Sequence, residues 1–159
     1  MHGESGLEAE MEVQKRHVLL VDDNPNDLEL ALEVMNQRTQ GGPKVVTAQG
    51  GPEALAYLSA HRGRCERPSL VLLDLNMPQL GGLDVLDAIR ADAELHDIPV
   101  IMLTTSGEPS DIQACYKRGA NGYLVKPPDL SVFAETLKAT ITFWLGVNQI
   151  SQAPAVQPA

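Results

Sequence analysis

The sequence predicts an α/β fold in which a doubly wound, five-stranded parallel sheet is covered by helices on both faces. Short apolar runs alternate five times with segments whose apolar residues recur at helical spacing, an order typical of such folds. Three of the runs, at 17–21, 70–73 and 99–103, are continuous rather than alternating. Continuous runs indicate strands buried on both faces, because helices lie above and below the sheet. We therefore expect a single domain over residues 16–147.

The elements of the first half begin and end at local signals. An apolar run ends where polar residues begin, and a helix starts where Pro or a small polar residue precedes helical spacing. Gly41, Gly42 and Pro43 stop the first helix. These signals predict a strand at 17–21, a helix from Pro25 to about Arg38, a strand at 44–48, a helix from Gly51 to about His61 and a strand at 70–73.

The second half continues the alternation. The apolar run at 99–103 ends at Thr104, Ser110 is expected to cap a helix, and Asp129 is expected to begin a long final helix. The elements predicted here are a helix from Leu83 to about Asp92, a strand at 99–103, a helix from Ser110 to about Arg118, a strand at 122–125 and a helix from Asp129 to about Leu145.

Composition and charge narrow the classes of function. The net charge of -9, with a pI near 4.8, disfavours binding to nucleic acid or to anionic membranes. We expect no transmembrane helix, because no apolar run is long enough to span a membrane. We expect no signal peptide either, because residues 1–16 are polar and lack an apolar core. Cys65 and Cys115 form no metal-binding or disulfide pattern, which favours a reduced, cytoplasmic chain. Residues 1–15 and 148–159 are expected to be a flexible tail and a disordered tail.

Polar functional groups follow four of the five predicted strands. Because the carboxyl ends of parallel strands lie along one edge of a sheet, we expect these groups to converge in one shallow pocket. The residues are Asp22 and Asp23 after the first strand, Asp74 after the third, Thr104 after the fourth and Lys126 after the fifth.

Three carboxylates at one sheet edge require a positive charge among them. Two such charges about 4 Å apart repel by roughly 4 kcal/mol at an effective dielectric constant near 20. Mg2+ suits this position because it prefers hard oxygen ligands, and Lys126 adds a second positive charge. Taken singly, Asp22 and Asp23 could instead cap the first helix, and Asp74 could be a turn residue.

The strand ends lie in four longer segments. These are 20–24 (LVDDN), 72–78 (LLDLNMP), 103–106 (LTTS) and 122–127 (GYLVKP). Each is a weak signal alone, but all four in this order and spacing resemble the response-regulator receiver domains of two-component signalling. The resemblance covers residues 16–145, most of the chain, and implies the (βα)5, flavodoxin-like receiver fold.

The resemblance implies a role for each matching residue. Asp74 is the implied phosphoacceptor for a sensor histidine kinase. Thr104 and Tyr123 are the implied switch residues, a hydroxyl that bonds the phosphoryl group and an aromatic ring that turns inward. Lys126 would contact the phosphate, and its peptide bond to Pro127 would be cis. The implied Mg2+ ligands are Asp22 (through a water), Asp23, Asp74 and the backbone carbonyl of Asn76.

Two details leave parts of this assignment open. Tyr123 could also be an ordinary half-buried strand residue, since side-chain rotation cannot be read from sequence. Many receivers have Asp-Gly a few residues past the proline that follows the acceptor, where this chain has Gly81 and Gly82. The change removes a surface or capping carboxylate, so it bears on the stability of that loop and not on the site residues.

The output of such a domain is expected to be a surface, because only about fourteen residues follow Leu145. The last helix has more apolar residues than one face on a small sheet needs, which predicts a homodimer through that helix and the neighbouring strand and helix. The alternative is that Trp144 folds back on its own core. The predicted interface residues are Phe133, Leu137, Phe143 and Trp144.

A finer likeness rests on three short motifs: Phe-Trp-Leu at 143–145, the loop at 103–106 and Asn-Pro at 24–25. They are similar to the small response regulators that pair with cyanobacterial phytochromes and bacteriophytochromes. The likeness implies a light-regulated bacteriophytochrome kinase as the phosphate donor. It implies no enzyme activity beyond the protein's own phosphorylation and dephosphorylation.

Three other functions are compared with this one. A phosphatase of the haloacid dehalogenase type needs a second acid two residues after the nucleophile, where this chain has Asn76. A nucleotide- or flavin-binding module needs a glycine-rich loop after the first strand, where this chain has the acidic segment 22–25. The remaining alternative is a degenerate receiver that acts as a protein-interaction module without phosphorylation, although all the expected site residues are present.

Overall fold

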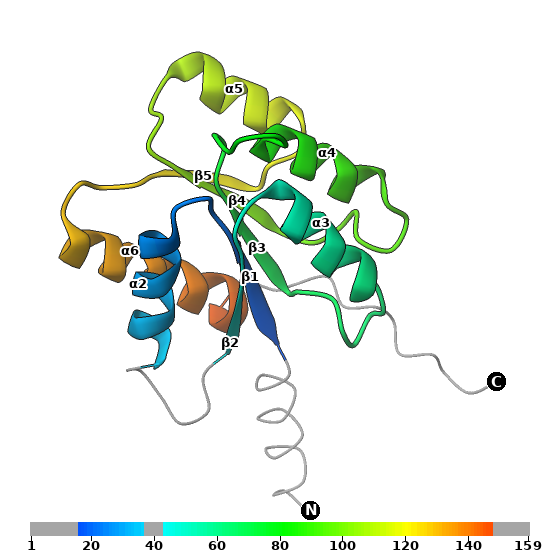
Figure 1. The fold of residues 1–159 in the computed structure, drawn as a ribbon, viewed down its shortest axis with the longest axis horizontal. Helices are drawn as coiled ribbons and strands as arrows, with labels where there is room; N and C mark the ends of the chain where they lie inside the picture. Colours follow the sequence, from blue (N-terminus) through cyan, green and yellow to red (C-terminus); the bar gives the residue numbers. More distant parts are fainter. Residues whose placement is uncertain (1–15, 37–42, 148–159) are drawn as a thin grey trace, which may run out of the picture.

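The computed structural model describes residues 16–36 and 43–147. The strands are β1 (His17–Val21), β2 (Lys44–Ala48), β3 (Leu70–Leu73), β4 (Val100–Thr104) and β5 (Gly122–Val125). They form one parallel sheet in the order β2-β1-β3-β4-β5, which confirms the predicted fold class (Figure 1). The tails predicted at 1–15 and 148–159, and the predicted end of the first helix, lie outside the described residues.

Helices cover both faces of this sheet. They are α2 (Pro25–Asn36), α3 (Gly51–Ala60), α4 (Gly82–Ala91), α5 (Pro109–Lys117) and α6 (Leu130–Thr142), and α6 continues into a π-helical segment, η1 (Phe143–Val147). Figure 1 shows α2 and α6 on one face and α3, α4 and α5 on the other. In the part of the chain described, none of these helices has the length and apolar character needed to cross a membrane.

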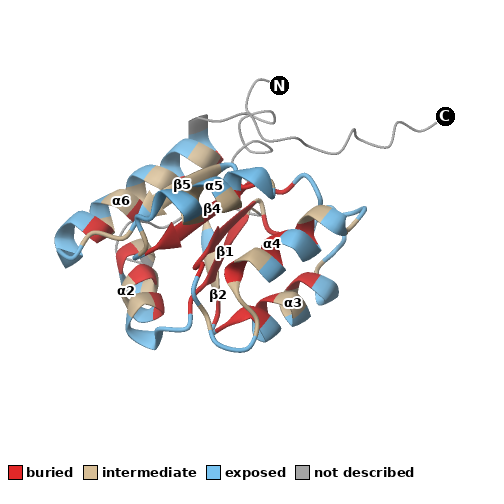
Figure 2. Ribbon diagram, turned by 90° about the horizontal axis from the view of Figure 1, so that it is seen from above, coloured by how far each residue is buried: buried red, intermediate tan, exposed pale blue. Residues whose placement is uncertain are grey.

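Two apolar cores, one on each face of the sheet, hold the layers together. Successive strand residues point to opposite faces. Leu19 and Val21 of β1 therefore join the core under α3, α4 and α5, whereas Val18 and Leu20 join the core under α2 and α6. Every residue of β1, β3 and β4 is buried, and Figure 2 shows β1 in red. This burial explains why these strands appear in the sequence as continuous apolar runs.

The direction of winding reverses between β1 and β3. From β1 the chain crosses to β2 on one side, and it then returns to form β3 on the other side of β1. Such a reversal leaves a crevice at the carboxyl ends of the two strands, because their connections leave in opposite directions. Asp22 and Asp74 are the first residues after these two strands. The topology therefore places both at the crevice.

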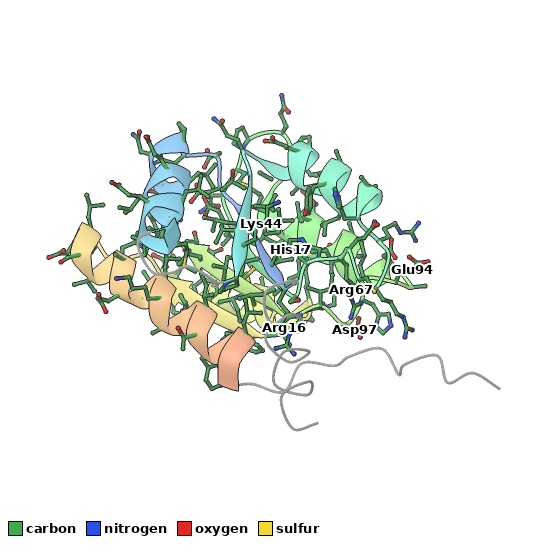
Figure 3. The ribbon with its side chains drawn as sticks, turned by 90° about the horizontal axis from the view of Figure 1, so that it is seen from below. Arg16, His17, Lys44, Arg67, Glu94 and Asp97 are labelled. Atoms are coloured by element: carbon green, nitrogen blue, oxygen red, sulfur yellow. The ribbon has the colours of Figure 1, made fainter. Side chains whose placement is uncertain are left out.

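At the end of the sheet opposite the site, where the strands begin, hydrogen bonds and an ion pair join the loops (Figure 3). Arg67 donates to the carboxylate of Asp97 (2.6 Å) and to the carbonyl of Glu94 (2.7 Å). Arg16 donates to the carbonyl of Leu145 (2.8 Å), which ties the beginning of β1 to the segment after α6. These contacts join elements distant in sequence, so they stabilise the arrangement of the layers.

Two local predictions are wrong. The helix α5 begins at Pro109, with Glu108 in the cap position and no side-chain cap, instead of at a capping Ser110. Proline is favoured in the first turn of a helix because its missing N–H needs no partner there. The peptide bond between Lys126 and Pro127 is trans, as are all the described peptide bonds. Bonds to proline prefer trans by about 0.5–1 kcal/mol.

Two of the residues predicted for a dimer surface belong to the core. Phe133 and Leu137 are 3% and 1% exposed and pack in the apolar core under α2 and α6. Trp144 packs partly buried against the same core, whereas Phe143 is 49% exposed. Helical spacing shows which residues share a face, but the position of the sheet decides which face is covered. Phe133 and Leu137 are therefore removed from the predicted interface.

Candidate functional site

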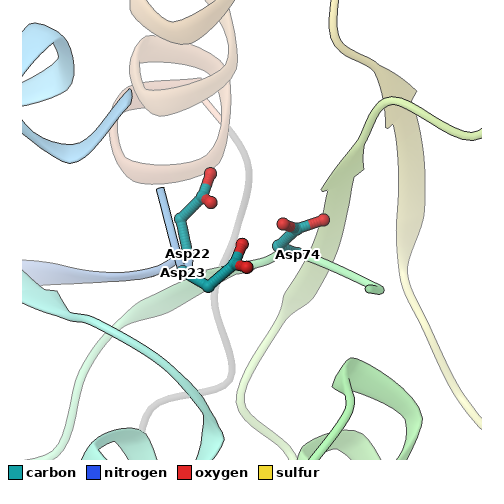
Figure 4. Close-up of side chains that lie close together, drawn as sticks. All are labelled: Asp22, Asp23 and Asp74. Atoms are coloured by element: carbon teal, nitrogen blue, oxygen red, sulfur yellow. The ribbon is translucent and has the colours of Figure 1, made fainter. Parts of the chain in front are cut away.

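Three carboxylates meet at the crevice beyond β1 and β3 (Figure 4). Asp22 and Asp23 follow β1, and Asp74 follows β3. Each offers one oxygen atom, and these atoms all lie within 4.8 Å of one another. Asp22 and Asp74 are buried, with 2% and 7% of their surface exposed, whereas Asp23 is more accessible. The fold therefore brings together the acids that the sequence places at separate strand ends.

The hydrogen-bond ladder of the sheet continues into the residues of the site. The backbone N–H of Asp22 donates to the last carbonyl of β2 (3.1 Å), and that of Asp74 to the last carbonyl of β1 (2.9 Å). The N–H of Lys126 donates to the carbonyl of Thr104 (2.7 Å). The backbone positions from which these side chains project are thus fixed by the sheet itself, which preorganises the site.

Gly82 allows α4 to begin against the backbone of Asp74. A Cβ atom on Gly82 would lie 2.2 Å from the carbonyl oxygen of Asp74 and 2.8 Å from the Cα of Leu75, far inside van der Waals contact. A Cβ atom on Gly81 would have no neighbour nearer than 3.5 Å. The N–H of Gly81 donates to the carboxylate of Asp84 (3.2 Å). Of the glycine pair noted in the sequence, the second is required by packing and the first is not.

Lys126 occupies the same crevice and is nearly buried, with 8% of its side chain exposed. Its ammonium Nζ lies 2.5 Å from Oδ2 of Asp22 and 3.0 Å from Oδ2 of Asp27, a residue in the first turn of α2. Its distance to Oδ2 of Asp74 is longer, at 3.8 Å. The lysine is therefore held mainly by the α2 side of the site and faces the implied phosphoacceptor at close range.

Burial is the main influence on the ionisation of Asp74. It raises the pKa of this carboxyl group from 3.8 to about 6, because the charged form loses hydration. The positive charge of Lys126 opposes the rise, and the negative charge of Asp22 adds to it. Hydrogen bonds from the Thr104 hydroxyl and the Asn76 backbone N–H to the carboxylate also lower the pKa. The pKa is thus higher than that of an ordinary surface aspartate.

The pKa of Lys126 is shifted in the direction that keeps the ammonium charged. Burial alone would lower this pKa, because it removes water from the charged form. The hydrogen bond and charge of Asp22, the charge of Asp74 and the hydrogen bond to Asp27 outweigh burial, and the pKa is raised. Lys126 is therefore a permanent cation in the crevice at physiological pH.

The acidic cluster fits a hard divalent cation. Asp22, Asp23 and Asp74 bring three negative charges to one place, and Lys126 brings one positive charge. Carboxylate oxygens are the ligands that Mg2+ and Mn2+ prefer. The backbone N–H of Asn76 donates a hydrogen bond to the Asp74 carboxylate, so the Asn76 peptide lies at the site. The role of its carbonyl oxygen as a ligand stays a prediction.

A hydrogen-bonded loop connects Thr104 to Tyr123. Thr104 is fully buried, and its hydroxyl oxygen accepts from the N–H of Ser106 (3.4 Å). The hydroxyl of Tyr123 donates to the carbonyl of Ser106 (2.7 Å). The hydroxyl of Ser106 donates to the carboxylate of Asp111 on α5 (2.5 Å). Ser106 therefore has hydrogen bonds to both predicted switch residues and to α5. A movement of this loop would change the contacts of all three.

Sequence reasoning missed Asp27 and the pair of Ser106 and Asp111. Asp27 looks like an ordinary acid in the first turn of a helix, a position that the helix dipole favours. Its partner Lys126 lies 99 positions away, so spacing alone could not pair them. Asp111 likewise looks like a first-turn acid of α5. The only available signal was the presence of an acid one turn after the Asp22–Asp23 pair.

Comparisons with known proteins agree with this geometry. The family model described as the response regulator receiver domain matches residues 18–138. Response regulator Rcp1 of Synechocystis sp. is 36% identical over 131 residues, which are 80% of this chain and 88% of Rcp1. The probable methanogenesis regulatory protein FilR2 of Methanothrix harundinacea is 34% identical over 139 residues, 87% of this chain and 88% of FilR2.

Two solved structures show the same fold at similar identity. The phosphorylated cyanobacterial phytochrome response regulator RcpA has a TM-score of 0.78 and 35% identity, with 88% of this chain and 99% of RcpA covered. The Mn2+-bound form of Rcp1 has a TM-score of 0.75 and 33% identity, with 86% of this chain and 99% of Rcp1 covered. The predicted likeness to regulators of the phytochrome type is confirmed by these matches.

Proposed function

This chain belongs to the response regulator receiver domain family, and we propose on that premise that it accepts a phosphoryl group from a sensor histidine kinase onto Asp74. The observation that carries the proposal is the surroundings of the Asp74 carboxylate. It lies in an acidic cluster suited to a divalent cation, 3.8 Å from the Lys126 ammonium, and it accepts a hydrogen bond from Thr104. A signalling role of this kind needs no turnover of an external substrate.

The residues present can perform the transfer. An Asp74 carboxylate oxygen attacks the phosphorus atom, the bond from phosphorus to the donor's imidazole nitrogen breaks, and an acyl phosphate forms. Charge develops on the three equatorial oxygens of the phosphoryl group in transfer. A bound Mg2+ held by Asp22, Asp23 and Asp74 would neutralise part of that charge. Lys126 would neutralise another part through its ammonium, and Thr104 would donate its hydroxyl hydrogen bond.

The same contacts suggest how the phosphoryl group changes the protein. If the Thr104 hydroxyl turns from its present partners to the phosphoryl group, the loop that carries Ser106 must follow, because the N–H of Ser106 donates to that hydroxyl. The carbonyl of Ser106 accepts a hydrogen bond from Tyr123, and the hydroxyl of Ser106 donates one to Asp111. We therefore expect Tyr123 and the beginning of α5 to move with Thr104.

Phosphotransfer from a labelled kinase tests the proposal. The wild-type protein should remove radioactive phosphate from an autophosphorylated histidine kinase in the presence of Mg2+ and should become labelled itself. Asp74→Asn should accept no label, because an amide oxygen is a poor nucleophile, whereas Asp87→Asn, a change at an exposed acid on α4, should be labelled like wild type. Absence of label on the wild type with every kinase tried would favour the degenerate receiver instead.

For the donor, we propose a light-regulated kinase of the phytochrome class, a bacteriophytochrome. Support comes from RcpA, which is described as a phytochrome response regulator and matches over 88% of this chain. FilR2 matches a similar share of this chain but is described as a methanogenesis regulatory protein, so the donor has to be tested with a panel of kinases. A bacteriophytochrome kinase should transfer label to this protein within seconds, and kinases of other sensor classes should do so far more slowly. Equal rates across the panel would contradict the assignment.

We further propose a homodimer through the outer side of α6 and the start of η1. This surface takes the place of the two buried residues of the predicted interface. Val132 and Phe143 are each 49% exposed, and Ala139 between them is also exposed. The hydroxyl of Thr136 donates to the carbonyl of Val132 (2.8 Å), so its polar atom is satisfied within the helix. Spaced at i, i+4, i+7 and i+11, these residues form one side of the helix. We call Val132, Thr136, Ala139 and Phe143 the outer stripe.

The partners we propose are proteins, a kinase and a second copy, with the cytoplasm as the place of action. The net charge of -9 disfavours contact with nucleic acid and anionic lipid. Cys65 and Cys115 are free thiols, which suits a reducing compartment. Labelled phosphotransfer in a cytoplasmic fraction, absent from the membrane fraction, would support this location.

A further inference from the structure

The ammonium of Lys126 is shared by three carboxylates, one on α2 and one in each of the loops that follow β1 and β3. An ammonium group has three N–H donors. Asp22 takes one at 2.5 Å and Asp27 takes another at 3.0 Å, which leaves one toward Asp74 at 3.8 Å. Two of the three donors are therefore used by acids that do not carry the phosphoryl group.

Asp22 and Asp27 differ in how tightly they are bound to this arrangement. The Asp22 side chain is 3% exposed, and its other oxygen accepts from the backbone N–H of Asn24 (2.9 Å). The Asp27 side chain is 24% exposed and lies at the longer distance from the ammonium. A buried carboxylate that loses its cation is left uncompensated, whereas a partly exposed one can be hydrated. Asp27 is therefore the partner that Lys126 can leave at lower cost.

We propose that Asp27 is a positioning residue that holds the Lys126 ammonium on the α2 side of the site and releases it when a phosphoryl group occupies Asp74. The inference rests on the proposed phosphoacceptor function, because the release is a response to the phosphoryl charge. It adds to that function a competition between Asp27 and the phosphoryl oxygens for a single ammonium.

The competition has a definite direction. To approach the phosphoryl group, Nζ must cover the remaining distance to the Asp74 side, and the contact to Asp27 is the one that lengthens. Contact with Asp27 thus stabilises the unphosphorylated arrangement relative to the phosphorylated one. A ligand that must break a contact binds more weakly by the free energy of that contact. Removing the charge of Asp27 should therefore strengthen binding of a phosphoryl analogue.

Beryllofluoride with Mg2+ is the probe, and Asp27→Asn is the variant, since the amide keeps the shape and removes the charge. Glu29→Gln is the matched control, because Glu29 is an exposed acid two residues further along α2, on the opposite side of the helix. Fluorescence titration should give about fivefold tighter binding of beryllofluoride for Asp27→Asn than for wild type. Glu29→Gln should bind like wild type.

A double-mutant cycle shows whether Asp27 acts through Lys126. In a Lys126→Met background, Asp27→Asn should no longer change the affinity, because there is no ammonium to compete for. An effect that persists without the ammonium, or equal effects of Asp27→Asn and Glu29→Gln, would mean general charge repulsion and would overturn the proposal. Wild-type protein that binds no beryllofluoride would overturn the proposed function itself, a separate outcome.

A spectroscopic measurement keeps the test valid if Lys126→Met does not fold, since that change leaves Asp22 buried without its cation. The 15N signal of the Lys126 ammonium reports its hydrogen bonds directly. It should shift in Asp27→Asn, stay unchanged in Glu29→Gln, and shift in wild type when beryllofluoride and Mg2+ are added. A signal that is the same in wild type and Asp27→Asn would show that Asp27 does not hold the ammonium.

Discussion

Asp74 is a carboxylate whose ionisation the folded, metal-free protein disfavours. Its pKa is raised from 3.8 to about 6, so the folded state binds this proton more tightly than the unfolded chain does. The resulting contribution to stability is present below pH about 4 and is lost as the pH rises through about 6. At neutral pH the ionised side chain therefore reduces the free energy of unfolding, by about 2–3 kcal/mol.

Asp74→Asn removes that charge and should stabilise the metal-free protein at pH 7.5 by about 2 kcal/mol. Urea unfolding in the presence of EDTA measures the difference. The gain in the free energy of unfolding should shrink as the pH falls toward 4, because the carboxyl group of the folded wild type is then protonated and as neutral as the amide. A difference that stays constant from pH 4 to 7.5 would show that the pKa of Asp74 is not raised.

Asp23 is the accessible acid of the cluster, so it should contribute to cation binding more than to folding. For wild type, Mg2+ at a hundred times its dissociation constant should add about 2.7 kcal/mol to the free energy of unfolding. Asp23→Asn should reduce that gain to about 1.4 kcal/mol at the same concentration, if the lost ligand weakens binding about tenfold. Thermal unfolding with and without Mg2+ measures both values.

Glu135→Gln is the control for Asp23→Asn, because Glu135 is 78% exposed on α6 and carries the same charge. It should keep the full response to Mg2+. If Asp23→Asn responded to Mg2+ like wild type, the cation would have to be held without this carboxylate, and the predicted ligand set would be wrong.

At the scale of elements, the start of α4 depends on two glycines with opposite requirements. Gly82→Ala should destabilise the protein by about 2–4 kcal/mol and weaken Mg2+ binding, because the new Cβ must displace the Asp74 backbone from 2.2 Å. Gly81→Ser should stabilise it by about 0.5 kcal/mol, since Gly81 has an extended backbone with φ -79° and space for a side chain. Urea unfolding should separate the two variants clearly, and equal effects would contradict the packing argument.

The elements were predictable because most of the strands are apolar runs, and four of the five lead into a polar functional group. That signal located Asp22, Asp74, Thr104 and Lys126, because parallel strands place their ends on one edge. Contacts between distant segments were not predictable in this way. Lys126 binds Asp27 across 99 positions, a pairing that has no trace in local spacing. The helical periodicity of α6 likewise could not show that Phe133 faces the core, since that depends on the position of the sheet.

On the scale of the whole molecule, a short segment connects the site to the proposed dimer surface. Lys126 is the first residue after β5 and lies at the crevice. Asp129, three positions later, caps α6 by accepting hydrogen bonds from the backbone N–H groups of Ser131 and Val132. Val132 is the first residue of the outer stripe. A change in the position of Lys126 would therefore act close to the end of the helix that carries the stripe, which would connect the proposed phosphorylation to the proposed dimer.

The outer stripe predicts the state of association. Ala139→Glu should convert a wild-type dimer into a monomer, because it would bury a charge in the interface, and the dissociation constant should rise at least about a hundredfold. Ala88→Glu is the matched control, since Ala88 is also an exposed helical alanine but lies on α4, on the other face of the sheet. It should remain dimeric. Sedimentation equilibrium at high micromolar concentration distinguishes these outcomes, and a wild-type protein that stays monomeric with and without beryllofluoride would rule the dimer out.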